Sequence, residues 1–590
     1  MLGEGGHLRN PPNRYSASRR VVSAENATRL QQRGEAIASQ PAEAIAPPAA
    51  SVPRLRRTGR WSWTLTFSVG LPSASSRWSF DVLALLPLFV VGLVLRLVHL
   101  DGQSLWIDEL SQARTARLPI PAIFDRISRD VAATPLDYLG EKLTTGVFGI
   151  GTFQVRLWAF GAGCLAVAAI YVAARQLSGS RLTAALASGM LATSAFHVYY
   201  SQDARFYSLA MLVSLLNVLA FHRAWTRPGR VSWLLYALSV AALLYTHYFA
   251  SAILLSTEAV YAMGATAVDW WVHRADTPLK TRWQKPASWA VASALGVVAF
   301  APWLFSVTLT QLGTFSPSGP LPPLDADFVT RVLKDIFAYM VGEPGATALT
   351  QLTIALGLIG AASFISRRQG FAALLLVAVV ASIPMAWVAD ERAHYFWNSR
   401  QVAFIVPLTY LLAAEGVRAV VGVIGRLRAR ALPRVARVCL QVAALLVLVQ
   451  AWLPPAVAGV QRVNSGGVMT EDWRGAAYAI SESVCSDATI YSTVSASMYS
   501  GVGFYLPTLT PRMRLIGTIG VPLKQTVQET NFGPHDWLVV LTYGWFGPQP
   551  ELEAELKSQG WTEKRFVGIL LFRRSAACPE RIRDPVPTRR

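Results

Sequence analysis

The sequence predicts a mainly α-helical protein that crosses a membrane many times and ends in a small α/β domain. Hydrophobic residues make up 53% of its 590 residues and charged residues only 15%, which leaves too few charges for the surface of a soluble chain. Apolar segments long enough to cross a hydrocarbon core of roughly 30 Å recur between residues 80 and 454. Beyond Pro455 the acidic and amide side chains return, together with short apolar runs typical of strands.

The beginning of the chain differs from the rest. Residues 1–76 are rich in Arg, Ala, Ser and Pro and show no sustained apolar period, so they cannot bury enough surface to offset the entropy of ordering. We expect a disordered cytoplasmic tail there. Because no short apolar segment with a small-residue cleavage site begins the chain, we expect the first membrane helix to direct insertion.

About eleven membrane spans follow from the apolar pattern. The first begins near Phe80 and ends near Leu100. We expect the others near residues 153–174, 182–200, 206–222, 231–249, 250–270, 287–308, 347–366, 370–389, 399–418 and 436–454. Residues 77–455 would then form one membrane module.

Basic residues alternate with these spans in a regular order. The net charge of +19 comes from 54 Lys and Arg against 35 Asp and Glu, and most of the excess lies in the tail and in every second loop. Those loops hold Arg175 and Arg181; Arg223, Arg227 and Arg230; Arg274, Lys280, Arg282 and Lys285; Arg367 and Arg368; and Arg426, Arg428, Arg430, Arg434 and Arg437. The positive-inside rule places the N-terminus in the cytoplasm and, after an odd number of spans, the C-terminus outside. The same pattern accounts for the basic excess without a nucleic-acid partner.

The two long outer loops, 101–152 and 309–346, collect carboxylates, aromatic residues, Pro and Gly instead of basic residues. Functional residues concentrate in such loops. In the second loop, apolar residues from Phe328 to Met340 recur at helical spacing. This spacing predicts a helix that either lies in the membrane interface or packs on the protein itself.

Residues 456–590 predict a small α/β domain on the outer side. We expect helices at 472–482 and 551–559 and strands at 488–492, 537–542 and 562–573. Cys485 and Cys578 flank the strands and are the only cysteines outside the predicted spans. Because the periplasm permits such bonds, we predict a disulfide between them, with two free thiols as the alternative.

An adjacent pair of carboxylates follows the first span, in the sequence SLWIDE at residues 104–109. A carboxylate within hydrogen-bond reach of a hydroxyl can take its proton while the oxygen attacks a carbon. We assign Asp108 as candidate general base and Glu109 as orienting partner or metal ligand; two solvated loop carboxylates are the alternative. A divalent metal ion is left open, with His394 and His247 as further candidate ligands.

Basic residues on the same side are candidates for binding a phosphate group. They are Lys142, Arg156, Arg205, Arg392 and Arg400. Arg205 is favoured because a guanidinium can hold two phosphate oxygens at once, although an ion pair with Asp203 is the alternative. Arg400 could instead extend to lipid headgroups.

Several of these features occur together in one group of membrane enzymes. The chain resembles the bacterial GT-C glycosyltransferases related to protein O-mannosyltransferases and to the aminoarabinose transferases of lipid A, which are glycosyltransferase family 39-like. The resemblance covers most of residues 80–420. It rests on WIDE at 106–109, Pro-Leu-x-Tyr at 135–138, Arg156-Leu157, the segment Tyr200–Tyr207, and EDWRG at 471–475, where the outer domain begins.

The resemblance implies a GT-C fold in the bacterial inner membrane and transfer of a sugar from a polyprenyl-phosphate-linked donor to an envelope lipid, glycan or protein. It also implies a catalytic Asp in the first outer loop, which corresponds to Asp108. A typical Arg at the start of the second span corresponds to Arg156. One departure is that many relatives have His-Pro-Pro where this chain has Ala133-Thr134-Pro135, so a metal or donor contact by that His is not carried over.

Other classes of function remain open at this point. A polytopic transporter would also have about eleven spans and intramembrane Arg residues, but transporters usually place their sites near the bilayer midplane. A polysaccharide polymerase or ligase is the alternative within the enzymes, although the early Asp-Glu loop favours transfer of a single sugar. An assembly protein whose outer domain binds polysaccharide is a third reading.

Overall fold

The structure is a computed structural model, and the residues it describes lie between Arg77 and Ile582. Within this range it leaves out residues 130–132, 273–278, 310–322, 340, 394–397, 428–431, 468–469, 495–500, 517–522, 543–548, 575–577 and 579. The tail expected at residues 1–76 lies outside the described residues.

Nine helices in the described part of the chain are long and apolar enough to cross a membrane. They are α1 (Arg77–Leu97), α5 (Thr152–Ser178), α8 (Tyr207–Thr226), α10 (Tyr248–Val272), α11 (Leu279–Trp303), α14 (Glu343–Ser366), α15 (Gly370–Ala393), α16 (Ile405–Leu427) and α17 (Arg434–Asn464). Each corresponds to a span expected from the sequence. The two remaining expected spans correspond to shorter helices. The span expected at 231–249 is α9 (Arg230–Leu244), and the span expected at 182–200 is divided into two helices.

The expectation of a continuous span at 182–200 was wrong. The segment forms α6 (Arg181–Ala192) and the short α7 (Ala195–Ser201). A break leaves carbonyl groups at the end of α6 without helical partners. Buried Arg96 of α1 satisfies two of them, because its guanidinium donates to the Leu191 and Ala192 carbonyls at 3.0 Å each.

α14 and α16 approach each other closely through two glycines. A β-carbon at Gly360 would lie 1.9 Å from the Leu412 carbonyl oxygen, and one at Gly416 would lie 1.9 Å from that of Leu356. Neither position therefore has room for a side chain. Small residues of this kind allow membrane helices to pack backbone against backbone.

α17 continues beyond Pro455, where the sequence suggested that the membrane module ends. A proline inside a helix removes one hydrogen bond and crowds the carbonyl four residues earlier, yet α17 runs through Pro454 and Pro455 to Asn464. The helix stays amphipathic to its last turn. Its buried residues are Trp452, Ala456, Gly459, Val460 and Val463.

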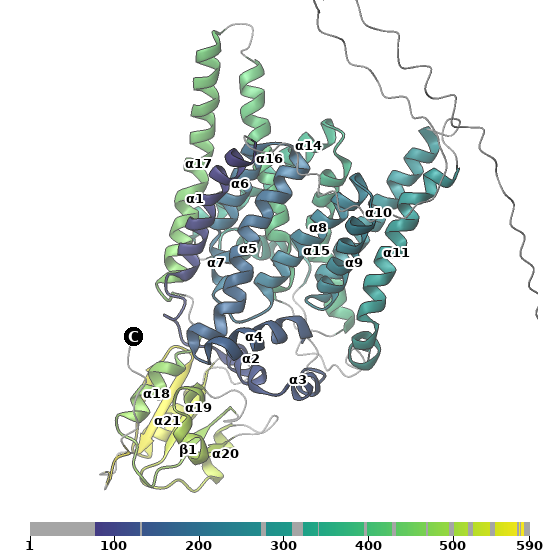
Figure 1. The fold of residues 1–590 in the computed structure, drawn as a ribbon. Helices are drawn as coiled ribbons and strands as arrows, with labels where there is room; N and C mark the ends of the chain where they lie inside the picture. Colours follow the sequence, from purple (N-terminus) through teal and green to yellow (C-terminus); the bar gives the residue numbers. More distant parts are fainter. Residues whose placement is uncertain are drawn as a thin grey trace, which may run out of the picture. The chain divides into compact units, whose positions relative to one another are not determined.

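Four shorter helices lie in the two predicted outer loops. They are α2 (Ile107–Arg117), α3 (Ile120–Ile127), α4 (Pro135–Phe148) and α13 (Ala326–Phe337). Figure 1 shows α2, α3 and α4 together at one end of the helix bundle, next to the C-terminal domain. The helix α13 packs on the protein, because Phe328, Val332 and Ile336 are buried in the main hydrophobic core.

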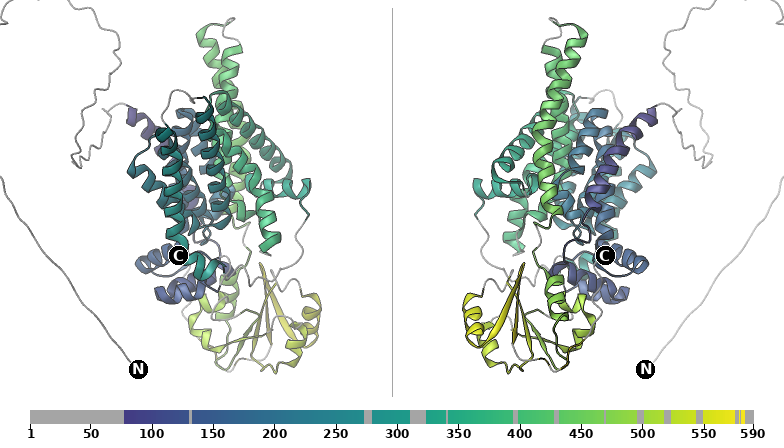
Figure 2. Two further views of the ribbon diagram at one scale, coloured as in Figure 1. Left: turned by 90° about the vertical axis from the view of Figure 1, so that its right-hand side faces the viewer. Right: turned by 90° about the vertical axis from the view of Figure 1, so that its left-hand side faces the viewer.

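The C-terminal domain contains a five-stranded sheet in the order β2-β1-β3-β5-β4. The strands are β1 (Ile490–Ser492), β2 (Met513–Leu515), β3 (Trp537–Leu541), β4 (Trp561–Phe566) and β5 (Ile569–Arg574). β1 pairs in parallel with β2 and β3, whereas β5 is antiparallel to β3 and β4. The helices beside the sheet are α18 (Trp473–Ser481), α19 (Gly501–Tyr505), α20 (Leu523–Glu529) and α21 (Pro550–Ser558), and Figure 2 shows them on both of its faces.

The central strand β3 connects two hydrophobic cores. Trp537 and Val539 belong to the core on one face of the sheet, and Leu538 and Val540 belong to the core on the other. This alternation is the period of two expected for a strand. The single closing strand expected at 562–573 was wrong, because Gly568 adopts φ +67° and turns the segment into the β4–β5 hairpin.

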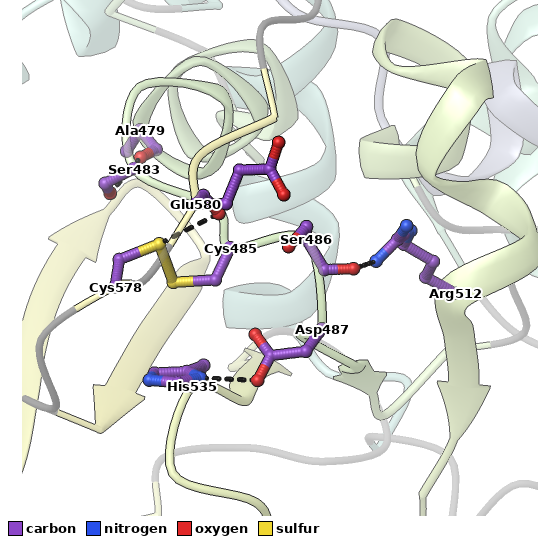
Figure 3. The surroundings of a disulfide bond; sticks show 9 residues. All are labelled: Ala479, Ser483, Cys485, Ser486, Asp487, Arg512, His535, Cys578 and Glu580. Carbon is purple, nitrogen blue, oxygen red and sulfur yellow. Dashed lines mark hydrogen bonds and ion pairs between the residues drawn. A yellow bond between two sulfur atoms is a disulfide. The ribbon is translucent and has the colours of Figure 1, made fainter.

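Cys485 and Cys578 are joined by a disulfide in the structure, with their Cα atoms 5.7 Å apart. Figure 3 shows the bond beside Asp487 and His535, whose Oδ2 and Nδ1 atoms lie 2.7 Å apart. The bond connects the segment before β1 to the segment after β5.

Candidate active site

The two adjacent carboxylates of α2 lie in different surroundings. Glu109 is completely buried, whereas the Asp108 side chain is 31% exposed. On a helix, neighbouring residues differ by about 100° in direction. Glu109 therefore points into the protein, while Asp108 remains accessible.

Buried Glu109 is held by Arg156 from the first turns of α5. Arg156 Nε donates to Glu109 Oε1 at 2.8 Å, and Nη2 donates to Oε2 at 2.7 Å. The remaining N–H groups of Arg156 reach the carbonyls of Leu100, Gln103 and Ser104. Every donor of this guanidinium therefore has a protein acceptor, and Arg156, which the sequence suggested as a donor-phosphate ligand, is bound to the loop that precedes α2 and to Glu109.

Backbone N–H groups complete the surroundings of Glu109. Ala204 donates to Oε1 at 2.8 Å and Trp106 donates to Oε2 at 3.3 Å. Both carboxylate oxygens thus have two donors each. Of the two roles suggested for Glu109, orienting partner or metal ligand, these contacts agree with the first.

Accessible Asp108 faces Arg400, from the short helix Ser399–Val402. Arg400 Nη2 lies 3.7 Å from Asp108 Oδ2. The Arg400 guanidinium lies over the rings of Trp106, at 5.2 Å, and Tyr207, at 5.6 Å. These cation–π contacts hold the cation beside the carboxylate, so the Arg400 side chain is directed at Asp108 in the structure.

Arg205 lies on the same side of α2. Its Nη1 donates to Gln112 Oε1 at 3.1 Å, and Gln112 Nε2 in turn donates to Asp137 Oδ2. Burial raises the pKa of Asp137 to about 6 and that of Glu141 well above its usual range. Arg205 is therefore close to carboxyl groups that burial makes harder to ionise.

Asp203 is a buried site residue that the sequence suggested only as an ion-pair partner. Its Oδ1 accepts a hydrogen bond from Trp106 Nε1 at 3.0 Å, and its Oδ2 has no hydrogen-bond partner among the residues that the structure describes. Burial raises the pKa of Asp203 to about 7, and the nearby Glu109 carboxylate adds to the rise. Asp203 fixes the indole on which Arg400 lies.

Lys142, the remaining candidate phosphate ligand with a described side chain, contacts backbone carbonyls and not Asp108, Arg400 or Arg205. Its Nζ donates to the carbonyls of Ala116 and Leu118 at 3.2 and 2.6 Å, at the C-terminal end of α2. A cation is favourable there because the last carbonyls of a helix carry a partial negative charge. The assignment of Lys142 to a donor phosphate is therefore not supported by its contacts.

Comparison with known proteins gives a likeness in fold. No family model and no curated protein matches the chain. Among solved structures, ArnT from Cupriavidus metallidurans in the apo state aligns with a TM-score of 0.50 and 14% identity, over 84% of this chain and 98% of that one. The chain has an ArnT-like fold. A structure of the same ArnT bound to undecaprenyl phosphate gives a TM-score of 0.48 at 15% identity, over the same shares of the two chains.

The ArnT-like fold confirms the mainly α-helical membrane architecture with a small C-terminal sheet domain that the sequence predicted. At this level of identity the likeness concerns the fold, and the multi-pass membrane arrangement follows from the helices themselves. The roles of individual residues rest on the contacts described above.

In this ArnT-like fold the C-terminal domain contacts the loop that carries Asp108. Arg474 of the EDWRG segment donates to the side chain of Asp101 at 3.0 Å and to that of Thr152 at 3.0 Å. The Tyr505 hydroxyl accepts a hydrogen bond from the Leu105 backbone at 2.9 Å. The motif that the sequence placed at the start of the outer domain thus supports the candidate site.

The remaining metal candidates receive no support from the described residues. His394 and the side chain of Arg392 lie outside them. His247 accepts a hydrogen bond from the Ala250 backbone, which caps α10. The one group of three potential ligands in the described part of the chain contains Cys485, which is disulfide-bonded.

Proposed function

We propose that this protein is a membrane glycosyltransferase that transfers a sugar from a polyprenyl-phosphate-linked donor to an acceptor hydroxyl. The observation that carries the proposal is the accessible Asp108 carboxylate beside Arg400, on a helix anchored by the buried Glu109–Arg156 pair. In such a transfer the acceptor hydroxyl loses a proton and the leaving phosphate gains negative charge. A carboxylate can take the proton, and a neighbouring cation can stabilise the phosphate. The ArnT-like fold and the resemblance of residues 80–420 to GT-C enzymes support the same reaction.

Asp108 acts as the general base in this proposal. It takes the proton of the acceptor hydroxyl while that oxygen forms a bond to the anomeric carbon of the sugar. The bond between this carbon and the phosphate oxygen breaks, and its electron pair leaves with the polyprenyl phosphate. A single displacement of this kind inverts the configuration of the anomeric carbon and needs no second nucleophile.

Arg400 and Arg205 stabilise the phosphate that leaves. Arg400 lies over Trp106 and Tyr207, so its guanidinium is oriented before any donor binds. Arg205 is oriented by Gln112. Guanidinium groups held in this way lose little freedom when they bind phosphate oxygens.

The orientation in the membrane is part of the proposal. We place α2, α3, α4 and the C-terminal domain on the periplasmic face of the inner membrane, with the N-terminus in the cytoplasm, because the basic loops lie between alternate spans. An alkaline phosphatase fused to the C-terminus would then be active. A C-terminal fusion that is inactive as a phosphatase but active as a cytoplasmic reporter contradicts this orientation.

Donor consumption tests the reaction. The purified protein is incubated with a radiolabelled polyprenyl-phosphate sugar and extracts of envelope lipids, glycans or proteins as acceptors. We expect release of polyprenyl phosphate and label in one acceptor fraction. An intact donor under all acceptor conditions would favour a transporter or a polysaccharide-binding assembly protein, whereas label in long polymers would favour a polymerase or ligase.

A further inference from the structure

A cavity lies far from Asp108, where α1, α5 and α8 meet. Its volume is about 540 Å³, and its lining includes Asp81, Tyr171, Arg175, His222, Arg223 and Arg227. Arg175 is about 28 Å from Arg156 along α5, at 1.5 Å of rise per residue. The cavity is therefore separate from the candidate active site and lies at the opposite end of the same helix.

The cavity carries an excess of positive charge. Its carboxylate, Asp81, already accepts hydrogen bonds from Tyr171 at 3.0 Å and from Arg175 at 3.3 Å. Arg223 and Arg227 are exposed and form no ion pair with any acidic residue that the structure describes. These two guanidinium groups are therefore available to an anionic group that enters the cavity.

An apolar surface continues from the cavity along the helices. Val172 lines the cavity and is 38% exposed, and Leu165, two turns earlier on the same face of α5, is 57% exposed. On α8, Leu216 is 43% exposed two turns before Arg223. The helices thus present positive charge at their ends and exposed apolar side chains toward the middle of the membrane. An amphiphile with an anionic head and an apolar tail has the complementary arrangement.

We propose that this cavity binds the headgroup of an anionic glycerophospholipid. Its phosphate contacts Arg223 and Arg227, and one acyl chain lies along Leu165 and Leu216. Guanidinium groups bind phosphate oxygens in pairs, and basic pockets between membrane helices on the cytoplasmic side bind anionic headgroups. The bound lipid connects the ends of α1, α5 and α8 and stabilises them without contacting Asp108.

The proposal is tested by lipid-dependent thermal unfolding of the purified protein in detergent. Phosphatidylglycerol should raise the midpoint, whereas phosphatidylcholine should have little effect. The double variant Arg223→Gln/Arg227→Gln should need about thirtyfold more phosphatidylglycerol for the same shift, because each cation contributes about 1 kcal/mol to binding at an anionic membrane surface. Arg434→Gln is the matched control, because this exposed arginine belongs to another predicted cytoplasmic loop and does not line the cavity.

Three outcomes would overturn the proposal. An equal response of wild type and double variant to phosphatidylglycerol would place the lipid elsewhere. An equal response to phosphatidylcholine would exclude recognition of the negative charge. Stabilisation by inorganic phosphate as large as that by phosphatidylglycerol, and lost in the double variant, would assign the cavity to a soluble anion and not to a lipid.

Discussion

Arg156 donates to both carboxylate oxygens of Glu109, at 2.8 and 2.7 Å, in a buried space between α5 and α2. This pair explains why two adjacent carboxylates have different roles. Glu109 fixes the start of α2, and the same turn of helix then presents Asp108 to the accessible side. The α2 segment thus carries one buried anchoring carboxylate and one accessible carboxylate.

Removing one partner of the Glu109–Arg156 pair should destabilise the protein. Arg156→Ala leaves a buried carboxylate without its cation, which costs about 3–5 kcal/mol. We expect a lower midpoint of thermal unfolding, measured by tryptophan fluorescence in detergent, and partial recovery in Arg156→Met/Glu109→Gln. Arg129→Ala is the control, because its ion pair with Asp125 is exposed and contributes at most about 1 kcal/mol. Equal midpoints for Arg156→Ala and Arg129→Ala would contradict the anchoring role.

Asp203 should make stability depend on pH. Its folded pKa is raised to about 7, so its contribution to stability is fully present below the unfolded pKa and is lost as the pH rises through 7. Asp203→Asn keeps an acceptor for Trp106 but cannot ionise. The variant should match the wild type near pH 4 and exceed it at pH 8 by about 2–4 kcal/mol.

The measurement for Asp203 is the unfolding midpoint of both proteins between pH 4 and pH 8. The exposed Asp125→Asn variant should show a difference from wild type that does not change over this range. If the Asp203→Asn difference is also independent of pH, the buried carboxyl does not titrate in this range and the account of its surroundings is wrong.

The architecture was largely predictable because it depends on local patterns. Apolar length located the nine long helices, and the changed composition after Pro455 indicated the sheet domain. The break between α6 and α7 was not predicted, because the residue that satisfies its carbonyls, Arg96, lies about a hundred residues earlier in the chain. The β4–β5 hairpin was missed although Gly568 was a local signal for a turn.

The candidate site was predictable only in part. The position of SLWIDE after the first span identified Asp108, but the different role of Glu109 depends on Arg156 and Ala204, which the fold brings to it from other helices. Lys142 and Arg156 were grouped with Arg205 and Arg400 because all four have the charge expected of a phosphate ligand. In the structure Lys142 and Arg156 donate to backbone carbonyls. The sequence does not reveal such hydrogen bonds, so it could not separate these two residues from Arg205 and Arg400.

Replacing the cations beside Asp108 should impair transfer even when charge is kept. Arg400→Lys loses the planar group that lies over Trp106 and can bind two phosphate oxygens, and we expect a fall in turnover of about a hundredfold. Arg205→Lys should act in the same direction. Arg331→Lys in α13 is the control, because that arginine is 62% exposed. Wild-type donor affinity and turnover in Arg400→Ala and Arg205→Ala would remove both residues from the site.

The disulfide of the C-terminal domain should be present in protein isolated without reductant. Peptide mapping should recover Cys485 and Cys578 in one linked peptide, whereas exposed Cys439 should be alkylated in the same digest and thus report the labelling reaction. Cys485→Ser/Cys578→Ser should lower stability by about 2–4 kcal/mol. Recovery of both cysteines as alkylated free thiols would contradict the bond.

Turnover of Asp108→Asn decides whether Asp108 is the general base. The substitution keeps the size of the side chain and removes its basicity, and at this partly exposed position it leaves the packing of the protein unchanged. We predict that purified Asp108→Asn unfolds at the wild-type midpoint and binds the polyprenyl-phosphate sugar, while transfer falls by about 10²–10⁴-fold. Near wild-type transfer by this variant with donor bound would contradict the assignment of Asp108 as the base.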